Sequence, residues 1–174
     1  MTRYAAFLRG VNLGRRTVKN AELKAAFAAL GYDNVQTLLA SGNVLFDARA
    51  DKGIREKVEA GLKQQFGFEV PIVLRPLDAL RRMAAANPFG RVAGADAQLH
   101  VLFVDPPLPE GYHPDGRAGD YDVAQVSGGE IFFIVYRKDD GTYLGSSKLL
   151  PDKVVPTGSI ATMRNWNTIL KAIA

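Results

Sequence analysis

The chain has 174 residues, no cysteine and a formal charge of +4 at pH 7. A domain of this length buries roughly 70% of the surface that its unfolded chain exposes, so we expect a fold that needs no disulfide. The lack of cysteine excludes a disulfide framework, a thiolate metal site and a cysteine nucleophile.

The lack of cysteine and of a predicted signal peptide favours a cytoplasmic protein. Arg9 interrupts the first apolar stretch, so no signal peptide is predicted. The longest apolar run, residues 131–136, is far too short to span a membrane. We therefore expect no membrane partner.

The charge is unevenly distributed along the chain. Residues 1–24 carry six basic residues against Glu22, a net charge of +5, whereas residues 101–125 carry five acidic residues against Arg117, a net charge of −4. A basic segment can attract phosphates or nucleic acid. The plainer interpretation is a soluble protein with a charged surface.

The first half of the chain, residues 3–75, alternates strand and helix signals. Short apolar runs predict four strands, and apolar residues at helical spacing predict a helix after the first and another after the third. This order is the split βαβ, or ferredoxin-like, arrangement, in which two helices cover one face of an antiparallel sheet. The predicted strands are residues 4–8, 35–39, 44–46 and 70–74.

Turn and cap residues mark the ends of these elements. Asn20 and Asp51 are expected to cap the two helices. Gly31 and Gly67 are expected to end them. Gly42-Asn43 is typical of a two-residue hairpin turn with positive φ values.

The second half is less regular, and we expect a distorted α+β arrangement without a sequence repeat of the first half. A proline- and glycine-rich loop follows its first strand. The predicted division is a ferredoxin-like half at 1–75, a connecting helix and loop at 76–97, and a second half at 98–174. The expected elements are a helix from Pro76 to Asn87, strands at 98–104, 121–126 and 131–136, a helix at 143–150 ended by Pro151, and a C-terminal helix at 166–173.

The stretch "FLRGVNLGRR", residues 7–16, ends the first strand. It lacks both the G-x-G-x-x-G spacing and the P-loop Gly-Lys-Ser/Thr ending. Gly10 and Gly14 could still turn backbone N–H groups toward an anion, with neighbouring arginines as charge partners. The competing interpretation is a turn in which Asn12 caps its own loop or adopts the left-handed conformation.

Several other site classes are weakly supported or excluded. An RNA-recognition domain needs stacking aromatics on two strands, and Arg9, Asn43 and Leu45 stand where such rings would fall. His100 and His113 lack zinc-ligand spacing, and the acidic residues around His113 are more typical of a solvated loop than of a cation site. Serine-nucleophile motifs are also absent. Together these observations predict no metal and no cofactor, and they identify no catalytic residue.

The stretch "TMRNWNTILK", residues 162–171, contains the start of the last predicted helix. Arg164, Asn165 and Asn167 are expected at the helix start, where unpaired N–H groups and the helix dipole favour an anion. Capping by the asparagines and core packing of Trp166 are the structural alternatives.

Three polar motifs carry a family resemblance: Arg-Gly-Val-Asn at 9–12, Ser-Gly-Asn at 41–43 and Thr-Met-Arg-Asn-Trp-Asn-Thr at 162–168. In their order and spacing the chain resembles the bacterial domain-of-unknown-function family 1697 over essentially its whole length. Arg15-Arg16 departs from that family, which often has glycine soon after the first asparagine. The resemblance implies an α+β fold with ferredoxin-like parts and brings no activity.

The leading functional hypothesis is a binding protein whose basic, asparagine-rich pocket holds an anion, either a phosphate-bearing small molecule or nucleic acid. One alternative is an enzyme acting on a small phosphorylated or nucleotide-like substrate, although no acid–base pair supports it. The other is an interaction module that forms a homodimer through a sheet edge. The expected ligand-binding residues are Arg9, Asn12, Asn43, Arg164, Asn165 and Asn167.

Overall fold

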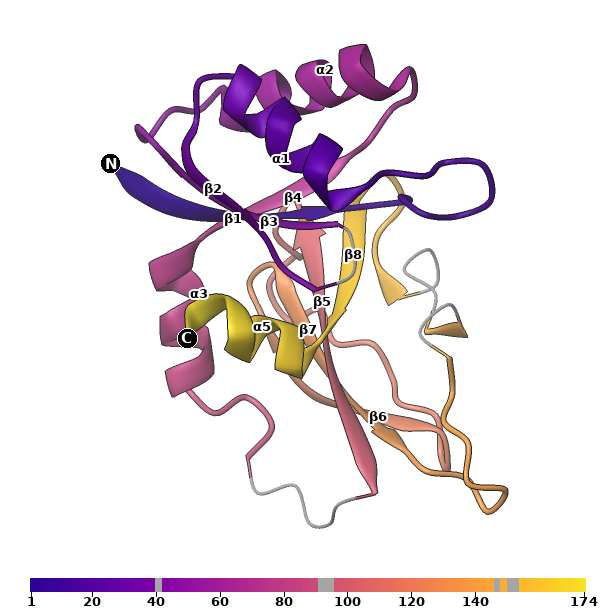
Figure 1. The fold of residues 1–174 in the computed structure, drawn as a ribbon. Helices are drawn as coiled ribbons and strands as arrows, with labels where there is room; N and C mark the ends of the chain where they lie inside the picture. The colour runs from indigo at the N-terminus through magenta and orange to yellow at the C-terminus, as the bar shows by residue number, and fades with distance from the viewer. Residues whose placement is uncertain (40–41, 91–95, 146–147, 150–153) are drawn as a thin grey trace. The chain divides into compact units, whose positions relative to one another are not determined.

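The computed structural model describes residues 1–39, 42–90, 96–145, 148–149 and 154–174. Its contacts divide the chain into two compact units. Unit 1 comprises residues 1–82 together with 171–174, and unit 2 comprises residues 83–170. Each unit is built on its own four-stranded antiparallel sheet, so the chain is an α+β protein (Figure 1).

Unit 1 has the ferredoxin-like arrangement predicted from the sequence. Its sheet order is β2-β3-β1-β4, and every neighbouring pair of strands is antiparallel. The elements are β1 (Thr2–Leu8), α1 (Asn20–Ala29), β2 (Asp33–Thr37), β3 (Asn43–Ala48), α2 (Ile54–Phe66) and β4 (Ile72–Pro76).

The core of unit 1 follows from the two-residue period of its strands. Alternate residues of β1, such as Tyr4 and Leu8, join Phe46 of β3 in one buried cluster. Phe27 of α1 and Leu62 of α2 are fully buried in the same cluster. Both helices therefore cover one face of the sheet, as Figure 1 shows.

The helix ends agree with the sequence at their C-termini but not at their N-termini, where Lys19 and Gly53 are the N-cap residues instead of Asn20 and Asp51. Gly31 and Gly67 have φ values of 83° and 78°, the left-handed conformation in which glycine commonly ends a helix. The N-cap of α1 is Lys19, whose N–H donates to Glu22 Oε2 at 3.2 Å, so the prediction of Asn20 as the cap is wrong. Asp51 Oδ1 accepts from the N–H of Gly53, the cap residue of α2, at 3.1 Å.

The predicted two-residue turn at Gly42-Asn43 is also wrong. Asn43 is the first residue of β3, pairs with Phe7 of β1 and is buried. Its side-chain N–H donates to the carbonyl of Leu38 at 3.2 Å, while the Leu38 N–H donates to the Asn43 carbonyl at 3.0 Å. In the described part of this connection, positive φ occurs at Gly42, as predicted, and at Leu39, but not at Asn43.

Unit 2 contains the sheet of order β6-β7-β5-β8, again with antiparallel neighbours. Strand β8 was not predicted, and it includes Arg164 and Asn165. The predicted helix at 143–150 is wrong where it can be compared, because Tyr143 forms an isolated β-bridge with Arg137. Residues 146–147 and 150–151 of that prediction lie outside the described residues. The remaining elements are α3 (Leu77–Ala85), β5 (Ala97–Asp105), β6 (Tyr121–Ser127), β7 (Glu130–Tyr136), β8 (Ile160–Asn165) and α5 (Trp166–Ile173).

The two sheets share one topology. Numbered within its own unit, each sheet has the strand order 2-3-1-4. In unit 1 the first and second strands are connected through α1, whereas in unit 2 the corresponding connection is the loop 106–120. This loop contains four prolines, which lack the N–H that a helix interior needs. The distorted second half therefore has a ferredoxin-like strand order, with a loop between its first two strands where unit 1 has α1.

Packing of that loop helps to close the core of unit 2. Leu108 and Tyr112 lie against the buried cluster that contains Leu102 and Phe133. The Tyr112 hydroxyl donates to the carbonyl of Val154 at 2.8 Å.

Among the described residues, no helix combines the length and the apolar character needed to cross a bilayer.

Candidate functional site

The first motif lies where β1 ends. The N–H of Leu8 donates to the carbonyl of Gly42 at 2.8 Å, and the N–H of Arg9 donates to the carbonyl of Pro71 at 2.9 Å. Arg9 is therefore held between the beginning of β3 and the segment that leads into β4. Asn43 lies at this same end of the sheet, since it begins β3.

Asn12 organises the loop that follows. It has a φ of 57°, and its Oδ1 accepts from the N–H of Val18 at 2.8 Å. Its N–H donates to the carbonyl of Arg16 at 2.6 Å. Asn12 thus adopts the left-handed conformation and bonds within its own loop, as the turn interpretation predicted.

The same loop displays cationic side chains. Arg15 and Arg16 are both exposed, and the Arg16 guanidinium lies 5.5 Å from the centroid of the Phe68 ring. Within the part of the chain that the structure describes, neither guanidinium is paired with a carboxylate. We call residues 9–19 the basic loop.

The last motif differs from its prediction, because Arg164 and Asn165 end β8 instead of beginning a helix. Arg164 Nη1 donates to Thr162 Oγ1 at 2.7 Å and to the carbonyl of Met163 at 2.8 Å. Desolvation lowers the pKa of Arg164 to about 10. Asn165 Oδ1 accepts from the N–H of Asn167 at 2.9 Å and so caps the first turn of α5.

The six predicted residues thus form two groups. Arg9, Asn12 and Asn43 belong to one end of the sheet of unit 1. The other three, residues 164, 165 and 167, belong to the junction of β8 and α5 in unit 2. Trp166, at the same junction, packs with its ring centroid 5.1 Å from that of Phe89, which is the core role considered from the sequence.

The acidic region of unit 2 contains charge pairs that the sequence did not reveal. Asp120 pairs with Arg117 at 2.7 Å and with Lys138 at 3.1 Å. Asp122 accepts a hydrogen bond of 2.6 Å from the Tyr136 hydroxyl, and this bond raises the pKa of Tyr136. No group of three or more potential metal-ligating side chains was found among the described residues.

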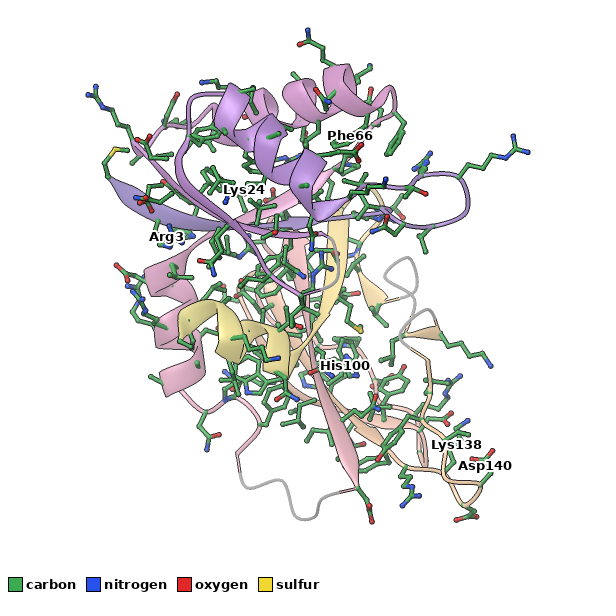
Figure 2. All side chains as sticks on the ribbon, viewed as in Figure 1. Arg3, Lys24, Phe66, His100, Lys138 and Asp140 are labelled. Atoms are coloured by element: carbon green, nitrogen blue, oxygen red, sulfur yellow. The ribbon has the colours of Figure 1, made fainter. Side chains whose placement is uncertain are left out.

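His100 occupies a different environment on β5 (Figure 2). It is 8% exposed, and its Nε2 lies 3.3 Å from Gln98 Oε1. Desolvation lowers the pKa of this imidazole.

Comparison with known proteins gives a family and a fold. Residues 1–132 match the model of a family described as "Protein of unknown function (DUF1697)". No curated protein matches the chain. Among solved structures, the chain is similar to the conserved bacterial protein SP0830 from Streptococcus pneumoniae, with 22% identity and a TM-score of 0.69 over 99% of this chain and 96% of that one. At this identity the likeness shows the fold alone.

Proposed function

From the residues of this chain, which belongs to the DUF1697 family of unknown function, we propose that it binds an anion through the basic loop. The ligand class is a phosphate-bearing small molecule or nucleic acid. The observation that carries this proposal is the pair of exposed arginines, Arg15 and Arg16, that have no carboxylate partner among the described residues.

The loop backbone supports this role because it is organised before any ligand arrives. Asn12 holds the loop closed through its bonds to Val18 and Arg16, so little conformational entropy is lost when the guanidinium groups meet an anion. Guanidinium groups bind phosphate oxygens in a bidentate manner. Arg9 and Asn43, at the same end of the sheet, are proposed as further ligand contacts in unit 1.

The motif at β8 and α5 remains part of the proposal as a second group of donors. Within unit 2, Arg164, Asn165 and Asn167 would offer guanidinium and amide N–H groups to an anion of their own. Desolvation of Arg164 would strengthen its interaction with an anion, since charges attract more strongly in a medium of low dielectric constant.

The test is a titration of the Arg15→Ala, Arg16→Ala double variant with inorganic phosphate, ATP and a single-stranded oligonucleotide. If the loop contacts phosphates, removal of two contacts weakens oligonucleotide binding and reduces the slope of log K against log salt by about 1.4, since each contact to a single strand contributes about 0.7. Binding of ATP with little oligonucleotide affinity would identify the ligand as a small molecule.

The matched control is Arg49→Ala, Lys52→Ala, which removes two exposed positive charges elsewhere in unit 1. We expect this variant to bind nearly as well as the wild type. Equal weakening by both double variants would indicate only a general effect of net charge and would contradict a site in the basic loop. Enzymatic turnover, homodimer formation and a cytoplasmic location stay predictions.

A further inference from the structure

Two exposed leucines lie at the same end of unit 1 as the basic loop. Leu13, near the middle of that loop, is 67% exposed. Leu39, which follows β2, is 47% exposed. The Leu39 carbonyl accepts from the side-chain N–H of Asn20 at 2.9 Å, so Leu39 lies beside the beginning of α1, where the basic loop ends. This end of unit 1 therefore combines apolar surface with positive charge.

The Arg16 guanidinium is held in place by an aromatic residue. Its central carbon lies over the Phe68 ring, 5.5 Å from the ring centroid, and the face of an aromatic ring attracts a cation. Its Nη1 lies 3.7 Å from the position that a Cβ on Gly10 would occupy, so the guanidinium also borders the loop backbone. The Phe66 ring, labelled in Figure 2, has its centroid 6.3 Å from that of Phe68. Arg16 thus continues a row of two aromatic rings and is itself exposed.

The carboxylate next to Phe68 in the chain is paired with a different cation. Glu69 Oε1 lies 2.5 Å from Lys63 Nζ, and among the described residues it forms no ion pair with Arg16. Arg15 and Lys19 are exposed in the same loop, which extends beyond the end of β1 in Figure 1. Several cations on one loop suit a ligand that carries several phosphates.

We propose that the anion bound by the basic loop is single-stranded nucleic acid. Its bases contact Leu13 and the Arg16 guanidinium, and its phosphates contact Arg15 and Lys19. This inference rests on the proposed function and names the ligand class of that same site.

The accessible base faces of a single strand are what distinguish this ligand from other phosphates. Such faces stack on guanidinium planes and pack against apolar side chains. A duplex buries the same faces between its base pairs, and inorganic phosphate has no surface that could cover Leu13. The position of Arg16 over Phe68 favours bases over lipid headgroups, because a guanidinium fixed on a ring presents a plane on which a base can stack.

The experiment is a fluorescence-anisotropy titration of the full chain with three labelled probes. These are a single-stranded DNA of about 12 nucleotides, within the usual size of a single-strand site, the duplex that it forms with its complement, and an abasic strand with the same number of phosphates. We expect the single strand to bind most tightly, because it alone offers both phosphates and accessible bases.

Leu13→Ser tests the base contact without removing a charge. We expect it to weaken binding of the single strand about fivefold, the equivalent of about 1 kcal/mol, and to leave the salt dependence of binding unchanged. The matched control is Leu170→Ser, which replaces an exposed leucine of unit 2 and should bind as the wild type does. Arg16→Lys keeps the charge but loses the planar group, so it should also weaken the single strand and retain the salt dependence.

Four results would overturn the proposal. Equal affinity for the normal and abasic strands would mean that phosphates alone are bound, and tighter binding of the duplex would exclude base stacking. Binding of ATP without binding of the single strand would identify a small ligand. Preferential binding to vesicles of equal parts phosphatidylglycerol and phosphatidylcholine would assign Leu13 to a lipid surface.

The Arg15→Ala, Arg16→Ala variant separates these failures from failure of the anion site. If it weakens binding of whichever anion is bound, the basic loop remains the site and only the ligand class is wrong. If it binds every probe as the wild type does, the anion site itself is wrong.

Discussion

Three asparagines of the predicted site share one local behaviour: each forms a hydrogen bond within its own turn. Asn12 accepts from Val18, Asn43 donates to Leu38, and Asn165 accepts from Asn167. An asparagine amide carries both donor and acceptor atoms, so such a bond engages one end of the group. These residues shape the chain at all three motifs, and ligand contact would be an additional role.

Asn12 allows a test of what its loop requires. Asn12→Ala removes the bond to Val18 and places a Cβ-bearing residue without a polar side chain at a φ of 57°. We expect a loss of about 1–2 kcal/mol in the stability of the loop. The measurement is amide hydrogen exchange at Val18, which should become faster.

The matched variant is Asn12→Gly, which loses the same hydrogen bond while glycine tolerates the positive φ. It should fall between the wild type and Asn12→Ala in Val18 protection. Equal protection in all three proteins would mean that the side chain of Asn12 does not hold the loop.

Elements with strong apolar periodicity could be predicted from the sequence, and those fixed by distant contacts could not. The six elements of unit 1 were predicted because each contains apolar residues at strand or helix spacing, and because glycine follows both helices. Strand β8 was missed because its Thr162, Arg164 and Asn165 have no apolar alternation of their own. They become a strand through pairing with residues 100–105 of β5, some 60 positions earlier in the chain.

The turn before β3 illustrates the same limit. Glycine followed by asparagine is typical of a tight hairpin turn, but burial of Asn43 against Phe7 of β1 extended the strand by one residue. Pairing with a third strand thus overrode a local turn preference.

The loop that replaces a helix in unit 2 depends on the contact between Tyr112 and Val154. Tyr112→Phe removes the hydroxyl donor, so the carbonyl of the buried residue Val154 loses this hydrogen bond. We expect the free energy of unfolding to fall by about 1–2 kcal/mol, measured by urea denaturation followed through Trp166 fluorescence.

Tyr143→Phe is the control, since Tyr143 packs against the same core cluster. It should change stability by less than Tyr112→Phe does. If the two variants are equally stable, the hydrogen bond from Tyr112 does not contribute to holding the loop 106–120.

At the scale of the molecule, the candidate sites were predicted unevenly. Arginines and asparagines in short motifs pointed to the basic loop and to the β8–α5 junction. One cavity of unit 2 had no such signal, because its walls come from segments around residues 88, 114 and 124 that meet only after the sheet forms. No spacing in the sequence relates those segments.

The pH dependence of stability should show the contribution of His100. Burial lowers the pKa of His100 from its ordinary value of 6.5 in the folded protein, so the unfolded chain binds a proton more readily. Stability is then retained above pH 6.5 and falls as the pH drops toward the lowered folded-state value. The measurement is the urea midpoint at several pH values across this window.

His100→Gln should flatten that decline, because glutamine does not titrate. His113→Gln replaces the other histidine, which is exposed, and should retain the decline. If the decline persists in His100→Gln and disappears in His113→Gln, the titrating residue is His113 and the prediction for His100 is wrong.

The strand order 2-3-1-4 bears on how the chain is made. In each unit the strand that emerges first from the ribosome is an interior one: β1 pairs with β3 and β4, and β5 pairs with β7 and β8. The edge of β1 that pairs with β3 stays uncovered until residues 43–48 have been translated, and its other edge until residues 72–76 have been translated. The nascent protein therefore carries an apolar segment with unpaired backbone on both sides until β3 is made and on one side until β4 is made, and such segments are the ones that chaperones protect from aggregation.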